Sequence, residues 1–229
     1  MSAQPGTADE RRMNVLALDT ATEVLSLAAA CGDSWAALSV HQGLQHSPAL
    51  LPLAERMLRD LGRSVQDLDL VVCSIGPGSF TGIRIGLATA LGIAHGRSIP
   101  IVGVSTLDAW ASAWAAWPGD VFPVIDARRG NIYTARYSGG LRGGEYRDVS
   151  PAELGEILSA ARSPLLVGPD SPIILGLLGD RDDTATADAV DPRSILRLGK
   201  KTYAARGADT SLPQPLYLRK SEAERVSGR

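Results

Sequence analysis

Residues 71–96 read VVCSIGPGSFTGIRIGLATALGIAHG, and this stretch decides the expected fold. It opens with a short apolar and β-branched run, Val71 to Ile75, which is typical of a buried strand. The Gly-Pro-Gly at 76–78 breaks the strand in a tight turn, and Ser79 is a candidate N-cap for the helix that follows. The stretch therefore predicts a strand, a turn and a helix in immediate succession.

The predicted helix carries an unusual number of glycines. Each glycine inside a helix costs about 1 kcal/mol relative to alanine, so some packing interaction has to offset it. Gly82, Gly86 and Ala90 recur every four residues and form a stripe of small residues, with Ile83 and Leu87 in a bulky stripe beside it. Such a stripe lets another element approach closely. Two interpretations remain open: the helix packs only within its own domain, or one face also contacts another chain.

The chain before this stretch predicts a β-meander. A buried strand at 15–18 ends in Asp19 and Thr20, and strands at 24–30 and 35–40 follow after hairpin-length connections. Asp and Thr side chains bond readily to the local backbone, so both residues are suited to closing the first turn.

A second helix is predicted between this meander and the central stretch. Ser47-Pro48 supplies an N-cap and a proline at the first helical position, and Gly62 ends the helix. Its apolar residues follow helical spacing closely. They are Leu50, Leu51, Ala54, Met57, Leu58 and Leu61. Such a stripe faces the core by default.

The second half of the chain repeats the first in outline. An apolar strand at 121–125 ends in Asp126, as the strand at 15–18 ends in Asp19. This repetition predicts two related halves, with a helix break at Pro118-Gly119 near their boundary. The expected divisions are a disordered extension at 1–12, an N-terminal domain at 13–110, a smaller second domain at 111–220 and a frayed tail at 221–229.

The composition indicates a globular protein that does not bind nucleic acid by itself. The 229 residues are 45% hydrophobic and carry a net charge of −2, with a pI near 5.9, whereas proteins that bind RNA alone are more often basic. The two cysteines and three histidines lack the spacing of a metal site or a disulfide framework. With no signal peptide or membrane-spanning run visible, we expect a cytoplasmic protein without membrane contact.

Four segments together are specific: VLALDTATEVLSLA at 15–28, GPGSFTGIRIGLA at 76–88, GVSTLDA at 103–109 and PLYLR at 215–219. In order and spacing they resemble the bacterial TsaB family, also called YeaZ. The second motif is shared in part with TsaD, the catalytic relative. The resemblance implies a duplicated two-domain α/β fold of the actin/Hsp70-like (ASKHA, ribonuclease-H-like) class.

The resemblance also implies a function. Members of the family act as the non-catalytic scaffold partner of TsaD in threonylcarbamoyl transfer to tRNA adenosine. The implied contact uses the helices at 48–61 and 80–95, and the same face would form a homodimer. The expected interface residues are Leu50, Leu51, Ala54, Met57, Leu58, Gly82, Ile83, Gly86, Leu87 and Ala90. A TsaE-like ATPase is a further implied partner, tRNA joins only through the complex, and ATP or ADP is expected at the complex interface rather than as this chain's own cofactor.

The alternative is an enzyme that acts alone, either an actin-like ATPase or a glycoprotease-like peptidase. In actin-like proteins the first hairpin cradles nucleotide phosphates, so Asp19, Thr20 and Asp126 are candidates for a vestigial nucleotide loop. Arg128 and Arg129 would either meet an anion over a cleft between the halves or remain solvated. No metal ligands are predicted, and a peptidase would need a metal or a nucleophile with its base, which the sequence does not show. The sequence favours the scaffold.

Overall fold

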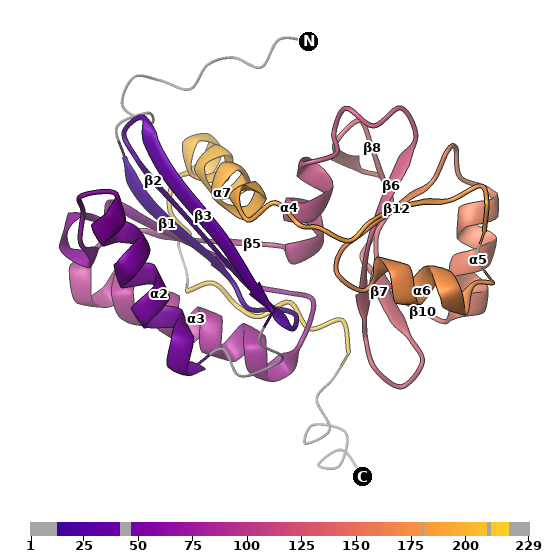
Figure 1. Cartoon of the computed structure of the whole chain (residues 1–229), viewed down its shortest axis with the longest axis horizontal. Coiled ribbons are helices and arrows are strands. Elements are labelled where there is room, and N and C mark those ends of the chain that lie inside the picture. Colours follow the sequence, from indigo (N-terminus) through magenta and orange to yellow (C-terminus); the bar gives the residue numbers. More distant parts are fainter. Residues whose placement is uncertain (1–12, 42–46, 180, 210–211, 220–229) are drawn as a thin grey trace.

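The computed structural model describes residues 13–41, 47–179, 181–209 and 212–219. They form two lobes that lie side by side (Figure 1). The expected extension at 1–12 and the expected tail at 221–229 lie outside the described residues. Within them, none of the helices combines the length and apolar character that crossing a bilayer requires.

The first lobe is built on a five-stranded sheet with the order β3-β2-β1-β4-β5. Its strands are β1 (Asn14–Asp19), β2 (Val24–Cys31), β3 (Ser34–His41), β4 (Leu70–Ser74) and β5 (Ile101–Val104). Tight turns make β1, β2 and β3 antiparallel, whereas helical crossovers place β4 and β5 parallel to β1. Leu16, for example, pairs with Ala29 on one side and Val71 on the other.

The second lobe repeats this plan. Its main strands are β6 (Asp120–Asp126), β7 (Ile132–Thr134), β10 (Arg147–Val149), β11 (Leu165–Val167) and β12 (Ala185–Ala187), in the order β10-β7-β6-β11-β12. As in the first lobe, the first three strands are antiparallel and the last two run parallel to the central strand. An additional hairpin, β8 (Tyr137–Ser138) and β9 (Leu141–Arg142), pairs with the start of β6. The predicted duplicated actin-like fold is confirmed.

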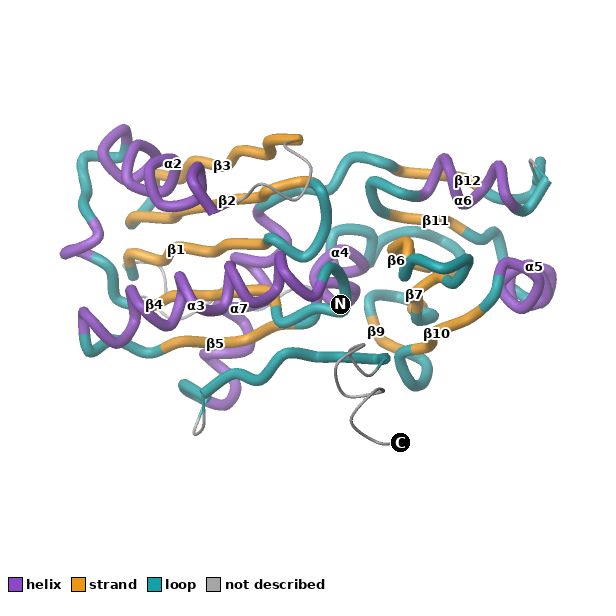
Figure 2. Tube along the Cα trace, turned by 90° about the horizontal axis from the view of Figure 1, so that it is seen from below, coloured by secondary structure: helices purple, strands orange, loops and turns teal. Residues whose placement is uncertain are grey.

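Two helices cover one face of each sheet. The first lobe uses α2 (Ser47–Asp60) and α3 (Phe80–Arg97), which lie on the same face in both ribbon views (Figures 1 and 2). The second lobe uses α5 (Pro151–Ser159) and α6 (Ser171–Leu177), which pack on one cluster with Phe122 and Val124 of β6. A short 3-10 helix, Val65–Asp67, leads into β4.

The opposite faces are covered by an exchange of helices. Helix α7 (Arg193–Arg206) follows the second sheet in sequence, but its Ile195 and Leu196 pack on the first sheet. At Gly199 an added Cβ would lie 2.3 Å from Val72, so the helix sits directly on β4. Conversely, α4 (Thr106–Ser112) follows the first sheet and packs its Leu107 and Trp110 against the second. Part of the predicted second domain at 111–220 therefore belongs to the packing of the first lobe.

Candidate functional site

The turn after β1 is held by buried hydrogen bonds. Asp19 is 3% exposed and accepts hydrogen bonds from the Ala21 amide at 2.9 Å and the Ser74 hydroxyl at 2.6 Å. Thr20 is fully buried, and its hydroxyl donates to the Gly82 carbonyl at 2.7 Å. These two predicted nucleotide-loop residues thus tie the turn to β4 and α3.

The glycine stripe of α3 accommodates this same turn. A Cβ added at Gly82 would lie 2.0 Å from the Thr20 carbonyl oxygen, and one at Gly86 would lie 2.2 Å from the Thr20 hydroxyl. The Ser79 amide also donates to the Ala21 carbonyl at 2.6 Å. The helix could not approach the β1–β2 turn so closely with larger residues here. For this stripe, packing within the chain's own domain is the correct interpretation.

Nine of the ten predicted interface residues are buried in the chain's own core. They are Leu50, Ala54, Met57, Leu58, Gly82, Ile83, Gly86, Leu87 and Ala90. The exception is Leu51, which is 42% exposed. Packing in the chain's own core accounts for these nine, because an apolar stripe at helical spacing marks the side of a helix that faces its own sheet just as well as one that faces a partner. Their direct contact with a partner stays a prediction.

The opposite side of α3 is open and consists largely of small residues. Thr81, Ala88 and Gly92 are exposed on it, and Arg84 and His95 lie beside them. A Cβ added at Gly92 would have no neighbouring atom within 4 Å, and the same is true of Gly96 one turn later. Ala88, Gly92 and Gly96 recur every four residues, and we call them the outer small stripe. Sequence reasoning missed it because it uses the same spacing as the buried stripe.

Helix α2 contributes a second exposed surface on the same side of the sheet. Leu51, Pro52, Glu55, Arg56 and Arg59 are exposed on it. Figure 2, seen from below, shows α2 and α3 both in front of the first sheet. Their exposed sides together are called the α2–α3 face.

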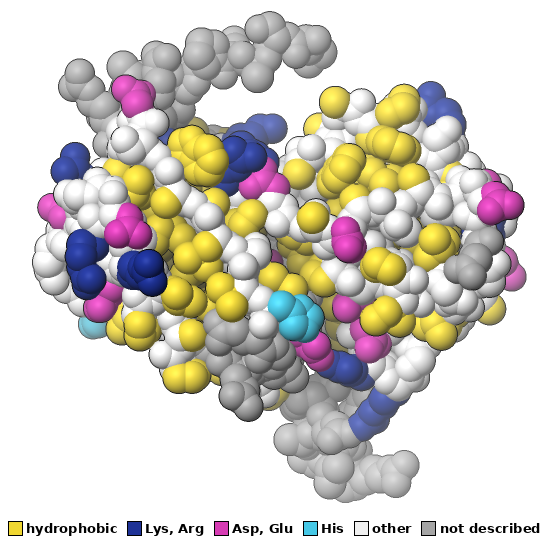
Figure 3. Space-filling view, in the orientation of Figure 1, with side chains coloured by type: hydrophobic (Ala, Val, Ile, Leu, Met, Phe, Trp, Pro, Cys, Tyr) yellow, Lys and Arg dark blue, Asp and Glu magenta, His cyan; other side chains and the backbone are white. Residues whose placement is uncertain are grey.

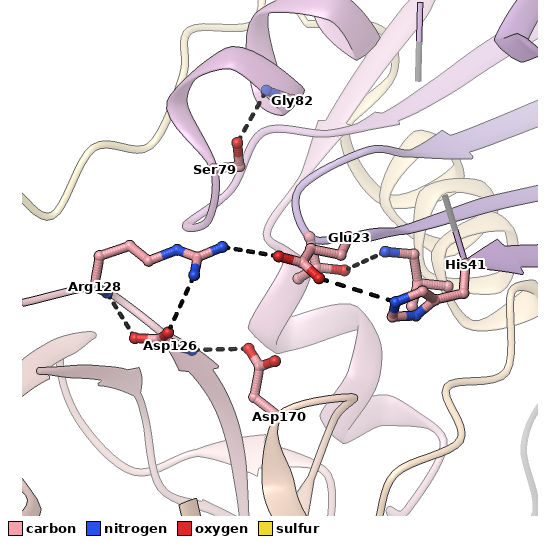
Figure 4. A network of polar contacts seen from close by, with 9 residues as sticks. Glu23, His41, Ser79, Gly82, Asp126, Arg128 and Asp170 are labelled. Carbon is pink, nitrogen blue, oxygen red and sulfur yellow. Dashed lines mark hydrogen bonds and ion pairs between the residues drawn. The ribbon is translucent and has the colours of Figure 1, made fainter. Parts of the chain in front are cut away.

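A network of charged side chains links the two lobes (Figure 4). The Arg128 guanidinium donates to Glu23 of the first lobe at 2.9 Å and lies 3.6 Å from Asp126 of its own lobe. The Asp126 amide donates to the Asp170 carboxylate at 2.8 Å. His41 Nε2 lies 3.9 Å from Glu23. Figure 3 shows acidic and basic side chains gathered along the line between the lobes.

The electrostatics of this network follow from its crowding. The hydrogen bond to Glu23 raises the pKa of Arg128 above its ordinary value. Burial raises the pKa of Asp170, and the neighbouring carboxylates of Asp126 and Glu23 act in the same direction. Arg128 therefore meets carboxylates of its own chain between the lobes, while 64% of its side chain stays exposed. Sequence reasoning did not identify Glu23 as the partner of Arg128, or Asp170 as the acceptor for the Asp126 amide, because nothing in their spacing connects them.

Residues 213–219, which we call the C-terminal strap, join the lobes a second time. The Leu216 amide donates to the Ile75 carbonyl at 2.7 Å. The Tyr217 ring stacks on Phe80 of α3 with centroids 5.0 Å apart. Arg219 then donates twice to Asp148 of the second lobe, at 2.9 and 2.8 Å. The PLYLR motif thus spans from α3 to β10.

Known proteins resemble this chain over most of its length. The chain is 34% identical over 226 residues to the tRNA threonylcarbamoyladenosine biosynthesis protein TsaB of Bacillus subtilis, and the match covers 93% of this chain and 96% of the relative. The chain belongs to the TsaB family. The TsaB of Escherichia coli is 36% identical over 164 residues, which are 68% of this chain and 64% of that protein.

Other comparisons agree with membership of the TsaB family. A family model described as TsaD, tRNA N6-adenosine threonylcarbamoyltransferase, matches residues 42–171, so this TsaB-family chain shares more than half of its length with that wider family. Among solved structures, YeaZ from Pseudomonas aeruginosa superposes with a TM-score of 0.76 at 23% identity, and covers 90% of this chain and 100% of its own. That likeness supports the fold.

Proposed function

We propose that this chain is the non-catalytic scaffold partner of a TsaD-like subunit in threonylcarbamoyl transfer to tRNA adenosine. Membership of the TsaB family, whose Bacillus subtilis and Escherichia coli members are described as tRNA threonylcarbamoyladenosine biosynthesis proteins, supports the pathway. The observation that carries the scaffold role is the outer small stripe of α3.

The outer small stripe lacks an explanation within the chain. Gly82 and Gly86 offset their helical cost by letting the β1–β2 turn approach. Gly92 and Gly96 each cost about 1 kcal/mol relative to alanine, yet no atom of the described residues comes within 4 Å of the position where their Cβ would lie. A helix of another chain that packs closely on α3 would supply the missing compensation. The α2–α3 face is accordingly the proposed contact with the TsaD-like subunit.

The same face is the proposed homodimer contact when the TsaD-like subunit is absent. Because one surface serves both, the two assemblies compete, and the TsaD-like subunit disperses the homodimer. A TsaE-like ATPase, and ATP or ADP at the interface of the complex, complete the proposed assembly. Its substrate tRNA places the assembly in the cytoplasm.

The non-catalytic role is supported by how the predicted nucleotide-loop residues are engaged. Asp19 and Thr20 are buried and hydrogen-bonded to their own chain, and Asp126 lies against Arg128. Calorimetry with ATP and magnesium on the chain alone tests this role. We expect no heat of binding and no turnover, and turnover would instead favour the stand-alone ATPase.

A single substitution tests the interface. Gly92→Leu adds a side chain to open space, so the chain should fold and gain about 0.5–1 kcal/mol of helix stability. Pairing should weaken by about 1–3 kcal/mol, roughly a 5- to 150-fold loss of affinity, because the added side chain overpacks the contact. Light scattering of the variant mixed with the TsaD-like protein of the same organism measures the loss.

The matched control is Gly176→Leu on α6 of the second lobe, where an added Cβ likewise has no neighbour within 4 Å. The Gly176→Leu variant should pair with the TsaD-like protein as the unmodified chain does. The melting temperatures of both variants should equal or exceed that of the unmodified chain. Unchanged pairing of Gly92→Leu would remove α3 from the interface. A wild-type mixture with no complex, even with nucleotide and the TsaE-like protein added, would contradict the scaffold role itself.

A further inference from the structure

Helix α7 is strongly cationic in an acidic protein. Its sequence, RSILRLGKKTYAAR, contains no acidic residue. Its five cations are Arg193, Arg197, Lys200, Lys201 and Arg206. The whole chain carries a net charge of −2, so this concentration of positive charge is local.

Packing of α7 directs four of these cations away from the core. Ile195, Leu196 and Gly199 are buried on the first sheet. Arg193, Arg197, Lys200 and Lys201 lie at positions i, i+4, i+7 and i+8, which share the other side of the helix. We call these four residues the α7 cationic face. The close contact of Gly199 with Val72 fixes the orientation of the face on a rigid sheet.

The face keeps an excess of positive charge. Asp191 accepts hydrogen bonds from both Arg193 and Arg197 at 2.9 Å; burial opposes its ionisation, but these contacts hold its pKa at about 2. That single carboxylate serves two guanidinium groups. Within the ranges that the structure describes, no carboxylate forms an ion pair with Lys200 or Lys201.

A groove of about 520 Å³ continues from the face toward the second lobe. Lys201, Thr202 and Arg206 of α7 line one side, and Ser105 and Tyr146 line the other. The Arg142 guanidinium lies 3.9 Å from the centre of the Tyr146 ring, in a cation–π contact. Asp108 also lines the groove and accepts a hydrogen bond from the Tyr146 hydroxyl at 2.7 Å, and Val104, Leu198 and Leu216 make part of the lining apolar. The cations on the α7 side suit a phosphate backbone, and the apolar part of the groove suits a sugar or a base.

We propose that the α7 cationic face binds the phosphate backbone of RNA and that the adjoining groove receives part of the same strand. That this RNA is the tRNA substrate rests on the proposed function. Helix α7 and the α2–α3 face lie on opposite sides of the first sheet, so an assembled complex leaves the cationic face accessible (Figure 1). The chain thereby adds an RNA contact to the complex without binding RNA firmly by itself.

The test uses the complex of this chain with its TsaD-like partner and a fluorescent tRNA from the same organism. The double variant Lys200→Glu, Lys201→Glu is compared with wild type by anisotropy at several salt concentrations. Each lost phosphate contact lowers the salt slope by about 0.7–0.9 and the affinity about sixfold at 0.1 M salt, so the pair should lose about 30-fold. The Lys200→Gln, Lys201→Gln variant loses the same two phosphate contacts without adding negative charge, so it should show about the same change in salt slope, and it keeps the test valid if the reversal fails to fold.

The matched control is Arg147→Glu, Arg162→Glu, which makes the same change in net charge on exposed residues of the second lobe. Equal loss of affinity in the control would reduce the effect to overall charge and overturn the proposal, as would an unchanged salt slope in the lysine variant. Loss of the TsaD-like partner with unchanged RNA affinity would assign the face to an acidic protein surface instead. If the wild-type chain forms no complex with the TsaD-like protein, the proposed function is wrong. If the complex forms but the lysine variant binds tRNA as well as wild type does, only the RNA-binding proposal is wrong.

Discussion

Gly86→Ala should destabilise the chain although it improves helix propensity. The added Cβ would lie 2.2 Å from the Thr20 hydroxyl, which is fully buried and donates to the Gly82 carbonyl at 2.7 Å. Displacing Thr20 sacrifices a buried hydrogen bond, at about 1–3 kcal/mol, and adds an overpacking cost of about 1–3 kcal/mol. The propensity gain of about 1 kcal/mol offsets only part of this loss. We expect a net loss of about 1–5 kcal/mol.

Urea and thermal unfolding measure this loss. For a chain of this size, about 2–4 °C of melting temperature accompanies each kcal/mol, so the expected decrease is about 2–20 °C. Gly92→Ala is the matched control, and it should gain about 1 kcal/mol because no atom lies within 4 Å of the added Cβ.

A double-mutant cycle identifies the cause of the loss. Thr20→Ala removes the hydroxyl that collides with the new Cβ, so it should cost less in the Gly86→Ala background than in the wild-type chain. A Gly86→Ala variant as stable as wild type, or purely additive effects in the cycle, would refute the packing argument.

Three further predictions concern charged residues. Asp120→Asn should lower stability at neutral pH. Burial opposes ionisation of Asp120, but the hydrogen bonds from the Arg162 amide and the Arg136 guanidinium outweigh burial and hold the pKa of Asp120 below its ordinary value. The stabilisation by the charged carboxylate is therefore present above about pH 4 and is lost as pH falls further. Asp170→Asn should raise stability at neutral pH and change it little near pH 3, because burial raises the pKa of Asp170 and its charged form opposes folding. Unfolding curves of both variants at neutral pH and at pH 3 check these predictions, and a change of the same sign in the two variants at neutral pH would contradict them. Arg219→Ala should cost about 1–3 kcal/mol and speed hydrogen exchange at the Leu216 amide, whereas Arg147→Ala should leave that exchange unchanged.

Local structure was predictable because local rules decide it. The run of Val71 to Ile75, the Gly-Pro-Gly break and the Ser79 cap gave the strand, turn and helix that the structure contains, and Ser79 does accept a hydrogen bond from the Gly82 amide. The repeat of a strand ending in aspartate, at Asp19 and Asp126, predicted the duplication.

The sequence did not decide which side of a helix faces the core, or which distant residues contact each other. Helix α3 carries two stripes of small residues at a spacing of four, and only the fold shows that Gly86 faces the β1–β2 turn whereas Gly92 faces outward. The ion pair of Glu23 with Arg128 joins residues 105 positions apart, which no local pattern encodes. The packing of α7 on the first sheet was missed for the same reason, because the apolar pattern of an amphipathic helix does not indicate which sheet the helix covers.

The exchanged helices have a consequence for how the two halves depend on each other. Severed in the connection between α4 and β6, each fragment would retain a complete sheet but lose the helix that seals its inner side, since α7 seals the first sheet and α4 the second. We therefore expect neither fragment to fold stably alone, whereas the two mixed together should complement each other. Such reciprocity is the arrangement of a swapped dimer whose two subunits have been fused into one polypeptide.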